Sequence, residues 1–375
     1  MIIAIDGYEA NVKNRVGIGR YGYEILRHLR SIINKSDNLM VRVYLPSHPL
    51  ADMPPECDWW QYRVASSTRL WTLIGLPWAI WRDKPRADVI FSPTHYIPRF
   101  IGIPKIMSIM DVSYLEYPGL FRLKDLYQLR RWTQYAVEHA VKILTISEFS
   151  KNAIMKAYQV PADHVDVIYP GLIMTGARCQ MSDVRRKYAL KTHYILSVGT
   201  LQPRKNFFRL IEAFSEFVRD SAHKEYELII VGKKGWIYED IISAPARFSV
   251  SDRVRFLDFV PDEDLPSLYR DARCFALPSL YEGFGLPVLE AMAQGCPVVV
   301  SNVSSLPEIA GKAGIYVDPN SVTDILRGLR DATDEDTAKK KLRVNLGLAQ
   351  AKKFSWDKAA IETLRVIEEV AKEKI

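Results

Sequence analysis

Residues 281–290 read Tyr281-Glu282-Gly283-Phe284-Gly285-Leu286-Pro287-Val288-Leu289-Glu290. Pro287 suits the first turn of a helix, and the apolar run 288–293 continues that helix. Glycines allow the backbone to approach a ligand closely, and a helix start presents free N–H groups and the positive end of the helix dipole. The stretch therefore predicts an anion-binding helix start, with Glu282 in the loop and Glu290 in the first helical turn.

The position of this stretch in the chain favours a ligand site over a simpler interpretation. Taken singly, Glu290 could complement the helix dipole and Glu282 could be a solvated loop charge. The stretch follows an expected strand end at 275–278 and precedes an expected strand at 297–301. It should lie at the carboxyl edge of a parallel sheet, where ligands bind. There Glu290 could accept two ribose hydroxyls and Glu282 could meet a sugar ring.

Short apolar runs alternate with helical patterns along most of the 375 residues, which predicts an α/β fold with parallel sheets. The first half contains expected strands at Ile2–Asp6, Val41–Leu45, Asp88–Ser92, Lys105–Met110 and Lys142–Ile146. The second half contains them at Tyr194–Val198, Glu227–Val231, Val254–Leu257, Cys274–Leu277, Val298–Ser301 and Ile315–Val317. This length suits two doubly wound, Rossmann-like domains. We expect them over residues 1–172 and 186–355, with a polar boundary near 170–190 and a final helix over 356–375.

A second polar stretch, 199–206, follows the first expected strand of the second domain and ends in Pro203-Arg204-Lys205-Asn206. Arg204 and Lys205 stand before an expected helix over 207–219. A helix start is an unfavourable place for cations unless an anion lies opposite them. A diphosphate would satisfy both cations, and the alternative is a pair of solvated basic side chains.

Together these motifs resemble glycosyltransferase family 4, whose members have the GT-B fold of two Rossmann-like domains facing across a cleft. The resemblance covers nearly the whole chain, and its most specific motifs are Glu282–Ala291 and Gly295-Cys296-Pro297-Val298. It implies that the chain is a retaining glycosyltransferase that uses a nucleotide diphosphate sugar and needs no metal or other cofactor. It also implies that the final helix packs on the N-terminal domain.

The resemblance also assigns roles to residues. Arg204 and Lys205 would bind the donor diphosphate and stabilise the leaving group, Glu290 would bind the ribose, and Glu282 the transferred sugar. The backbone from Gly283 through Phe284 and Gly285 to Leu286 would touch phosphate or sugar. The nucleobase would lie near Gly232 and 259–265. The clusters 262–264 and 334–336 superficially match the Asp-x-Asp motif of metal-dependent transferases, but both precede helical patterns, so helix capping explains them better.

The N-terminal half contains Gly17-Ile18-Gly19-Arg20-Tyr21-Gly22, a G-x-G-x-x-G match. Ten residues separate it from the first expected strand, and the second ends without an acid, so a dinucleotide site is excluded. The resemblance makes Gly17 and Gly19 a loop that closes over the donor phosphates and the acceptor, with assistance from Arg20. A simple helix entry is the alternative.

Acceptor-side residues are harder to find. Family members often have a His-Asp pair after the strand equivalent to 105–110, and here the pair is Met110-Asp111. Asp111 remains the best acceptor-side and catalytic candidate in this domain. His95, after the adjacent strand, is a second candidate, and a structural role is the alternative for both.

Composition narrows the class of partner. The net charge of +7 favours an anionic partner, but no nucleic-acid-binding motif is present, so we expect no nucleic acid. The start of the chain has no signal-peptide pattern, and no apolar run reaches the length of a membrane span, which predicts a cytoplasmic protein.

Tryptophans and basic residues gather in one region of the first half: Trp59, Trp60, Trp71, Trp78, Trp81, Arg69, Arg82, Lys84 and Arg86. This mixture predicts peripheral contact with an anionic membrane on the cytoplasmic face, supported by the basic region 122–142. Packing of 70–81 as a core helix remains the alternative.

The function that we predict is transfer of a hexose, mannose from GDP-mannose, to a glycan or lipid-linked saccharide in O-antigen or other surface-polysaccharide assembly. The choice of mannose rests on resemblance to bacterial surface-polysaccharide mannosyltransferases. Glucose, galactose, N-acetylglucosamine or rhamnose donors, including UDP-sugars, stay open. A nucleotide-sugar epimerase, a phosphorylase and a non-catalytic binding protein are the remaining alternatives.

Overall fold

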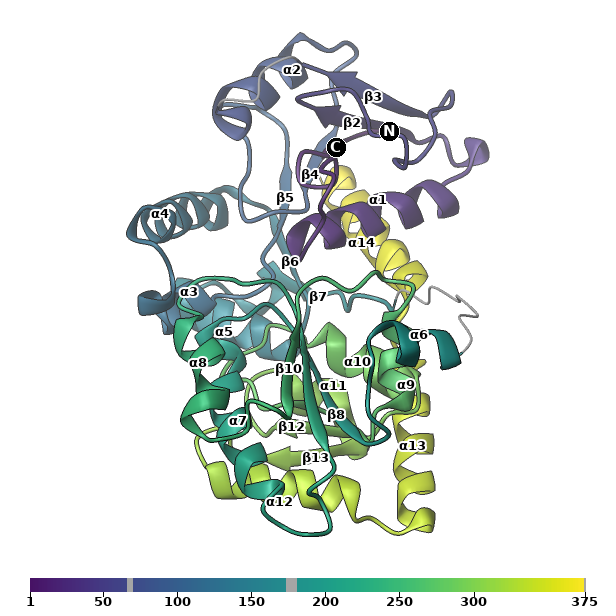
Figure 1. Ribbon diagram of the computed structural model, residues 1–375. Coiled ribbons are helices and arrows are strands. Elements are labelled where there is room, and N and C mark those ends of the chain that lie inside the picture. Colours follow the sequence, from purple (N-terminus) through teal and green to yellow (C-terminus); the bar gives the residue numbers. More distant parts are fainter. Residues whose placement is uncertain (66–69, 173–180, 374–375) are drawn as a thin grey trace. The chain divides into compact units, whose positions relative to one another are not determined.

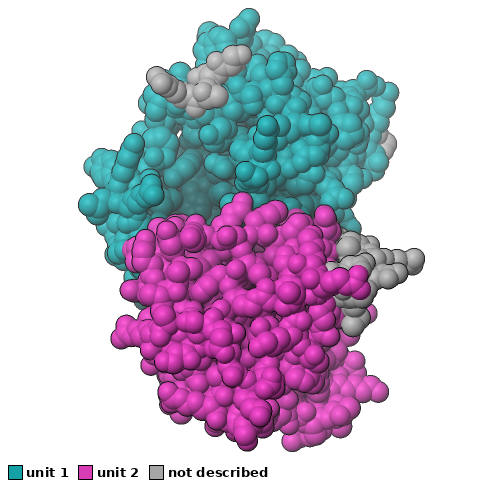
Figure 2. All heavy atoms as spheres, viewed as in Figure 1, with its two compact units in different colours: residues 1–171, 355–375 teal, residues 172–354 magenta. Residues whose placement is uncertain are grey.

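The computed structural model describes residues 1–65, 70–172 and 181–373 and divides the chain into two compact units. Unit 1 comprises Met1–Gly171 and Ser355–Ile375, and unit 2 comprises Leu172–Phe354 (Figure 2). Residues 173–180 of the expected polar boundary, and Arg69, lie outside the described residues. No helix in the described ranges is long and apolar enough to cross a membrane.

Unit 1 contains a seven-stranded parallel sheet in the order β3-β2-β1-β4-β5-β6-β7 (Figure 1). Its strands are β1 (Ile2–Asp6), β2 (Met40–Leu45), β3 (Trp60–Val64), β4 (Val89–Ser92), β5 (Lys105–Ser108), β6 (Lys142–Thr145) and β7 (Val165–Val167). Its helices are α1 (Ile18–Ile32), α2 (Leu76–Arg82), α3 (Ser113–Glu116), α4 (Leu123–His139), α5 (Glu148–Tyr158) and α14 (Trp356–Lys372). The central strands are almost fully buried, as expected for a sheet covered by helices on both faces.

Unit 2 contains a six-stranded parallel sheet in the order β10-β9-β8-β11-β12-β13. Its strands are β8 (Tyr194–Val198), β9 (Glu227–Val231), β10 (Val254–Leu257), β11 (Cys274–Leu277), β12 (Val298–Ser301) and β13 (Gly314–Val317). Its helices are α6 (Met181–Lys187), α7 (Phe207–Phe217), α8 (Glu239–Arg247), α9 (Leu265–Asp271), α10 (Leu286–Ala293), α11 (Leu306–Ala310), α12 (Val322–Thr333) and α13 (Thr337–Ala351). In both sheets the strand order reverses next to the first strand, which is the switch point of a doubly wound fold.

The predicted α/β fold is confirmed, and all eleven expected strands are present within two residues of their expected ends. Two strands were missed, β3 and β7, and each is the outer strand of the unit 1 sheet. β7 has three residues, and β3 alternates buried and half-buried side chains. Short edge strands are only partly covered, so they lack the continuous apolar run that marks a central parallel strand.

The final helix, α14, begins with Trp356, and it packs in unit 1 against α1. The Trp356 ring lies 6.0 Å from the ring of Tyr21 and 6.5 Å from that of His28, centroid to centroid. His28 Nδ1 also lies 2.7 Å from Asp357 Oδ1. Aromatic packing and a polar contact therefore hold the end of the chain on α1.

Candidate functional site

Three loops meet at the carboxyl edge of the unit 2 sheet. They follow β8, β11 and β12, and β11 lies between the other two strands. The β8 loop contains a 3₁₀ turn at Pro203–Lys205, and the β11 loop leads into α10. The backbone N–H of Leu280 donates to Arg204 O at 2.8 Å, which ties the first two loops together. Residues 77 or 78 positions apart in sequence thus share one site.

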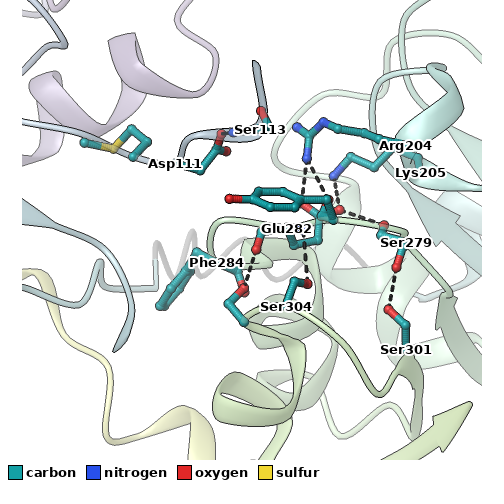
Figure 3. Close-up of polar contacts among 12 residues, drawn as sticks. Asp111, Ser113, Arg204, Lys205, Ser279, Glu282, Phe284, Ser301 and Ser304 are labelled. Carbon is teal, nitrogen blue, oxygen red and sulfur yellow. Dashed lines mark hydrogen bonds and ion pairs between the residues drawn. The ribbon is translucent and has the colours of Figure 1, made fainter. Parts of the chain in front are cut away.

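A charged cluster occupies this site (Figure 3). Lys205 Nζ donates to Glu282 Oε1 at 2.6 Å, and Arg204 Nη1 lies 3.3 Å from Glu282 Oε2. Arg204 Nη1 also donates to Tyr281 O at 2.9 Å. The anion opposite the two cations is therefore Glu282 itself. The sequence led us to expect an anion opposite these cations, with a diphosphate as one that would satisfy them, and in the structure a carboxylate of the same unit occupies that place.

Burial makes this cluster electrostatically strong. The side chain of Glu282 is 6% exposed and that of Lys205 is 9% exposed. Burial alone would raise the pKa of Glu282, but the charges of Lys205 and Arg204 outweigh it and hold the pKa below its ordinary value. Glu282 is therefore ionised at neutral pH, and the three side chains together carry one net positive charge.

Serines position the loop that carries Glu282. Ser279 Oγ donates to Glu282 Oε1 at 2.7 Å, and the Glu282 N–H donates to Ser304 Oγ at 3.1 Å. Ser305 Oγ lies 2.9 Å from the carbonyl oxygens of both Glu282 and Phe284. These bonds fix both the carboxylate and the backbone that follows it, so the loop is preorganised.

The predicted helix start is present, since α10 begins at Leu286 with Pro287 as its second residue. Gly285 precedes it with a φ of 102°, a conformation that L side chains rarely adopt, and no side chain among the described residues caps the helix. Glu290 lies in the second turn of α10, not in the first as expected, because the helix begins only at Leu286. Its carboxylate is thus displaced from the free N–H groups at the helix start.

A tyrosine from the neighbouring helix α9 orients Glu290. Tyr269 Oη donates to Glu290 Oε2 at 2.8 Å. Burial, and then the charge of Glu290, raise the pKa of Tyr269 well above its ordinary value, so the phenol remains a donor. No pattern in the sequence pointed to this tyrosine.

Phe284, by contrast, is buried within unit 2. Its ring meets that of Phe354 edge to face, with 5.5 Å between centroids. Its side chain packs against Phe354, and the predicted contact with phosphate or sugar is one that its backbone would make.

In unit 1, His95 and Asp111 follow the adjacent strands β4 and β5. Asp111 Oδ1 accepts from the Ser113 N–H at 2.9 Å (Figure 3). His95 Nδ1 is buried with no hydrogen-bond partner among the described residues. Burial lowers the pKa of His95 and the charge of Asp111 opposes that shift, so the imidazole is neutral at neutral pH. The structure thus brings these two predicted residues to one sheet edge.

The glycines of the first half belong to the start of α1. Gly17 precedes the helix with a φ of 51°, and Gly19 lies in its first turn, where a Cβ would come 2.9 Å from Glu9 O. Arg20 Nε lies 3.2 Å from Glu24 Oε1, one turn further along α1. In the structure this segment is the entry to a helix, which is the alternative interpretation given above.

The two acidic clusters differ from each other. Asp336 caps α13 by accepting from the Lys339 N–H at 2.9 Å, as predicted. Asp264 precedes α9 but makes no capping bond, because its carboxylate instead accepts from Lys187 and Tyr188, each at 2.7 Å. The described residues contain no group of three or more His, Cys, Asp or Glu side chains that could hold a metal.

Asp6 was predicted only as the end of a strand. It is buried at the carboxyl end of β1, where it accepts from Trp71 Nε1 at 2.9 Å. Burial raises its pKa to about 6, against the lowering effect of the Trp71 bond. An acid that ends an apolar strand was the only signal available in the sequence.

Two units that each contain a parallel, doubly wound sheet have the architecture of the GT-B fold. The Anabaena protein HepE, solved with UDP-glucose, matches 98% of this chain and 99% of its own with a TM-score of 0.73 at 19% identity. The family model "Glycosyl transferases group 1" matches residues 182–352.

Curated relatives agree with this class. The O-antigen chain mannosyltransferase B of Escherichia coli is 34% identical over 296 residues, which cover 76% of this chain and 75% of the relative. The O-antigen chain mannosyltransferase RfbU of Salmonella typhimurium is 30% identical, covering 82% of this chain and 84% of the relative. The chain belongs to the group 1 glycosyltransferases.

Proposed function

We propose that this glycosyltransferase transfers mannose, with retention of anomeric configuration, from GDP-mannose to a glycan or lipid-linked saccharide during assembly of an O-antigen or related surface polysaccharide. The reaction takes place in the cytoplasm or on the cytoplasmic face of the membrane. Two relatives named as O-antigen mannosyltransferases support the sugar and the process. The observation that carries the proposal is the buried cluster of Arg204, Lys205 and Glu282.

The charge of this cluster suits a nucleotide diphosphate sugar. Its three side chains carry one net positive charge, and a diphosphate brings the negative charge that complements it. When the anomeric bond breaks, negative charge grows on the departing diphosphate. Arg204 and Lys205, held in place by Glu282, stabilise that charge without reorganising. No metal is required in this scheme.

Glu282 has two roles in the proposal. In the structure described here it holds Lys205 and Arg204, and with donor bound it also contacts hydroxyls of the transferred sugar. Its ionised state is what both roles need, since a carboxylate only accepts hydrogen bonds. Glu290, oriented by Tyr269, accepts from the ribose hydroxyls. The backbone of Gly283, Phe284, Gly285 and Leu286 contacts phosphate or sugar.

The acceptor side of the reaction is assigned to unit 1. Asp111 and His95 provide polar groups at one sheet edge, and His95, neutral at neutral pH, can accept a proton or a hydrogen bond. In a retaining mechanism the leaving phosphate accepts the proton of the acceptor hydroxyl. Asp111 and His95 then orient the acceptor. Gly17, Gly19 and Arg20, at the start of α1, contact the donor phosphates and the acceptor in this proposal.

A UDP-sugar donor is the second candidate. HepE, whose fold matches that of this chain, was solved with UDP-glucose. At that identity the match shows the fold alone, whereas the mannosyltransferase relatives are more similar in sequence. GDP-mannose is therefore preferred.

Calorimetric titration with GDP, UDP and dTDP, with and without a chelator, tests the donor directly. The proposal expects GDP to bind most tightly and the chelator to have no effect. Product analysis with GDP-mannose and a saccharide acceptor then tests transfer and anomeric configuration. Preferential binding of UDP would replace the donor, and failure of all three nucleotides to bind would overturn the proposed site.

A further inference from the structure

The segment around α2 presents apolar side chains on two opposite sides. A π-helical turn at Trp71–Gly75 runs directly into α2 (Figure 1). Trp71, Leu76 and Ile80 are buried in a core cluster of unit 1. One side of this segment therefore packs in the core, as the alternative interpretation of 70–81 as a core helix expected.

The opposite side is exposed. Leu70, Ile74, Trp78 and Trp81 are 53%, 58%, 51% and 66% exposed. The spacing of four and three residues places Ile74, Trp78 and Trp81 along one side of this helical segment, and Leu70 directly precedes it. We call these four residues the α2 outer face. A row of large apolar side chains of this kind marks an interaction surface.

Basic side chains adjoin the α2 outer face. Arg82, Lys84 and Arg86 are all exposed, and the Arg82 guanidinium lies 5.1 Å from the centre of the Trp78 ring. Asp83 is the one acidic residue between Leu70 and Ala87. Its carboxylate is turned to its own unit, where it accepts from Tyr44 Oη at 2.9 Å and Arg63 Nε at 3.1 Å. The charge displayed beside the face is therefore positive.

We propose that the α2 outer face docks this protein on an anionic lipid bilayer, with Trp78 and Trp81 at the headgroup level. Tryptophan favours that depth because it joins a large apolar ring to a polar N–H. Basic residues beside it are attracted to anionic headgroups. A second copy of the chain suits this surface poorly, because a two-fold interface would bring the same three cations of both copies together. The proposal does not depend on the identity of the donor.

Sedimentation of the full chain with vesicles tests the proposal. Vesicles of phosphatidylcholine mixed with phosphatidylglycerol are compared with vesicles of phosphatidylcholine alone. We expect the protein to bind the anionic vesicles, and binding to weaken as salt is raised. The double variant Trp78→Ala/Trp81→Ala should lose roughly tenfold in partitioning, since interfacial binding scales with the buried apolar area. The variant Arg82→Gln/Lys84→Gln/Arg86→Gln should lose the preference for anionic vesicles.

Leu342→Ala is the matched control, because Leu342 is 61% exposed but belongs to α13 of unit 2. It should partition like the unchanged protein. All variants should keep the same thermal unfolding midpoint and the same turnover with a water-soluble acceptor, which separates this test from that of the proposed function. Equal vesicle binding by the double tryptophan variant and the unchanged protein would overturn the proposal. The proposal would also be overturned if the unchanged protein did not bind vesicles but formed a dimer that the double tryptophan variant did not form.

Discussion

The carboxyl edges of the two sheets differ in how their polar groups are held. In unit 2, loops from three neighbouring strands are joined by serine hydroxyls and by two ion pairs to one buried carboxylate. In unit 1 the two candidate acceptor-side residues have few bonds: Asp111 accepts from one backbone N–H, and Nδ1 of His95 is buried without a hydrogen-bond partner in the described residues. Asp6, at the same edge, is bonded to Trp71. Buried, mutually bonded charges favour a single geometry, whereas side chains with few bonds can be replaced without loss of the fold.

This difference suits the two halves of the reaction that we propose. The diphosphate of a donor is chemically constant, so a fixed arrangement of charges serves it. Acceptors differ from one polysaccharide to another, and side chains with few bonds tolerate the substitutions that accommodate them.

The difference between the two sheet edges predicts that the charged cluster of unit 2 contributes strongly to stability, and a small contribution would contradict it. Glu282→Ala leaves Lys205 and Arg204 buried without their carboxylate, and should lower the free energy of unfolding by about 3–5 kcal/mol. Denaturant unfolding measures the change. Asp331→Ala is the control, because Asp331 pairs with Arg327 on the surface of α12, and it should cost less than about 1 kcal/mol.

The same carboxylate predicts the direction of a pH effect. Since the folded state lowers the pKa of Glu282, its contribution to stability is complete above the ordinary value of 4.5 and is lost as the pH falls through the lower folded pKa. The stability difference between the unchanged protein and Glu282→Ala should therefore be constant near neutral pH and shrink only in acid. A difference that shrinks above 4.5 would contradict an ionised, paired Glu282.

Arg204→Ala tests the cluster in catalysis. It should lower turnover by about 10²–10³, the usual cost of losing one group that stabilises transition-state charge. Steady-state kinetics with saturating donor measure this change. Arg219→Ala, at an exposed position beyond the end of α7, serves as the control and should have no effect. Unchanged turnover in Arg204→Ala would remove this residue from the mechanism.

Tyr269→Phe tests whether the bond from Tyr269 to Glu290 contributes to donor binding in unit 2. Loss of the bond to Glu290 should raise the KM for donor by about tenfold. Hydrogen bonds to charged groups contribute on the order of 1.5–3 kcal/mol, and we expect only part of that free energy to be lost from donor binding. Turnover at saturation should not change. Tyr194→Phe removes a comparable phenol bond, to Leu268 O at 2.8 Å, and should leave KM unaltered. If the two variants changed the KM for donor equally, Tyr269 would have only a packing role.

The smallest effect is expected in unit 1. His95→Ala should raise the KM for acceptor by roughly two- to tenfold, as for one neutral hydrogen bond, and leave donor affinity unchanged. Because burial lowers the pKa of His95, protonation should reduce acceptor use only below its ordinary value of 6.5. Acceptor kinetics and nucleotide calorimetry on one preparation separate the two effects. Weaker donor binding in His95→Ala would contradict the assignment of unit 1 to the acceptor.

Sequence reasoning was most successful where local patterns decide the structure. Apolar runs located the central strands, and Gly285 with Pro287 located the start of α10. It failed at the edge strands β3 and β7, which are too short or too polar to form such runs. Asp264 also looked like a helix cap, but Lys187 and Tyr188, distant in sequence, compete for its carboxylate.

By itself the sequence determined the class of fold, the motifs of the site and the family that they resemble, since hydrophobic period and turn chemistry are local properties. Only the tertiary structure decided which charges meet. It paired Glu282 with Lys205, placed Tyr269 on Glu290, and left Trp78 exposed while burying Trp71. Such pairings depend on the order of strands in a sheet and on which side of a helix faces the core. Both are set by packing between segments far apart along the chain.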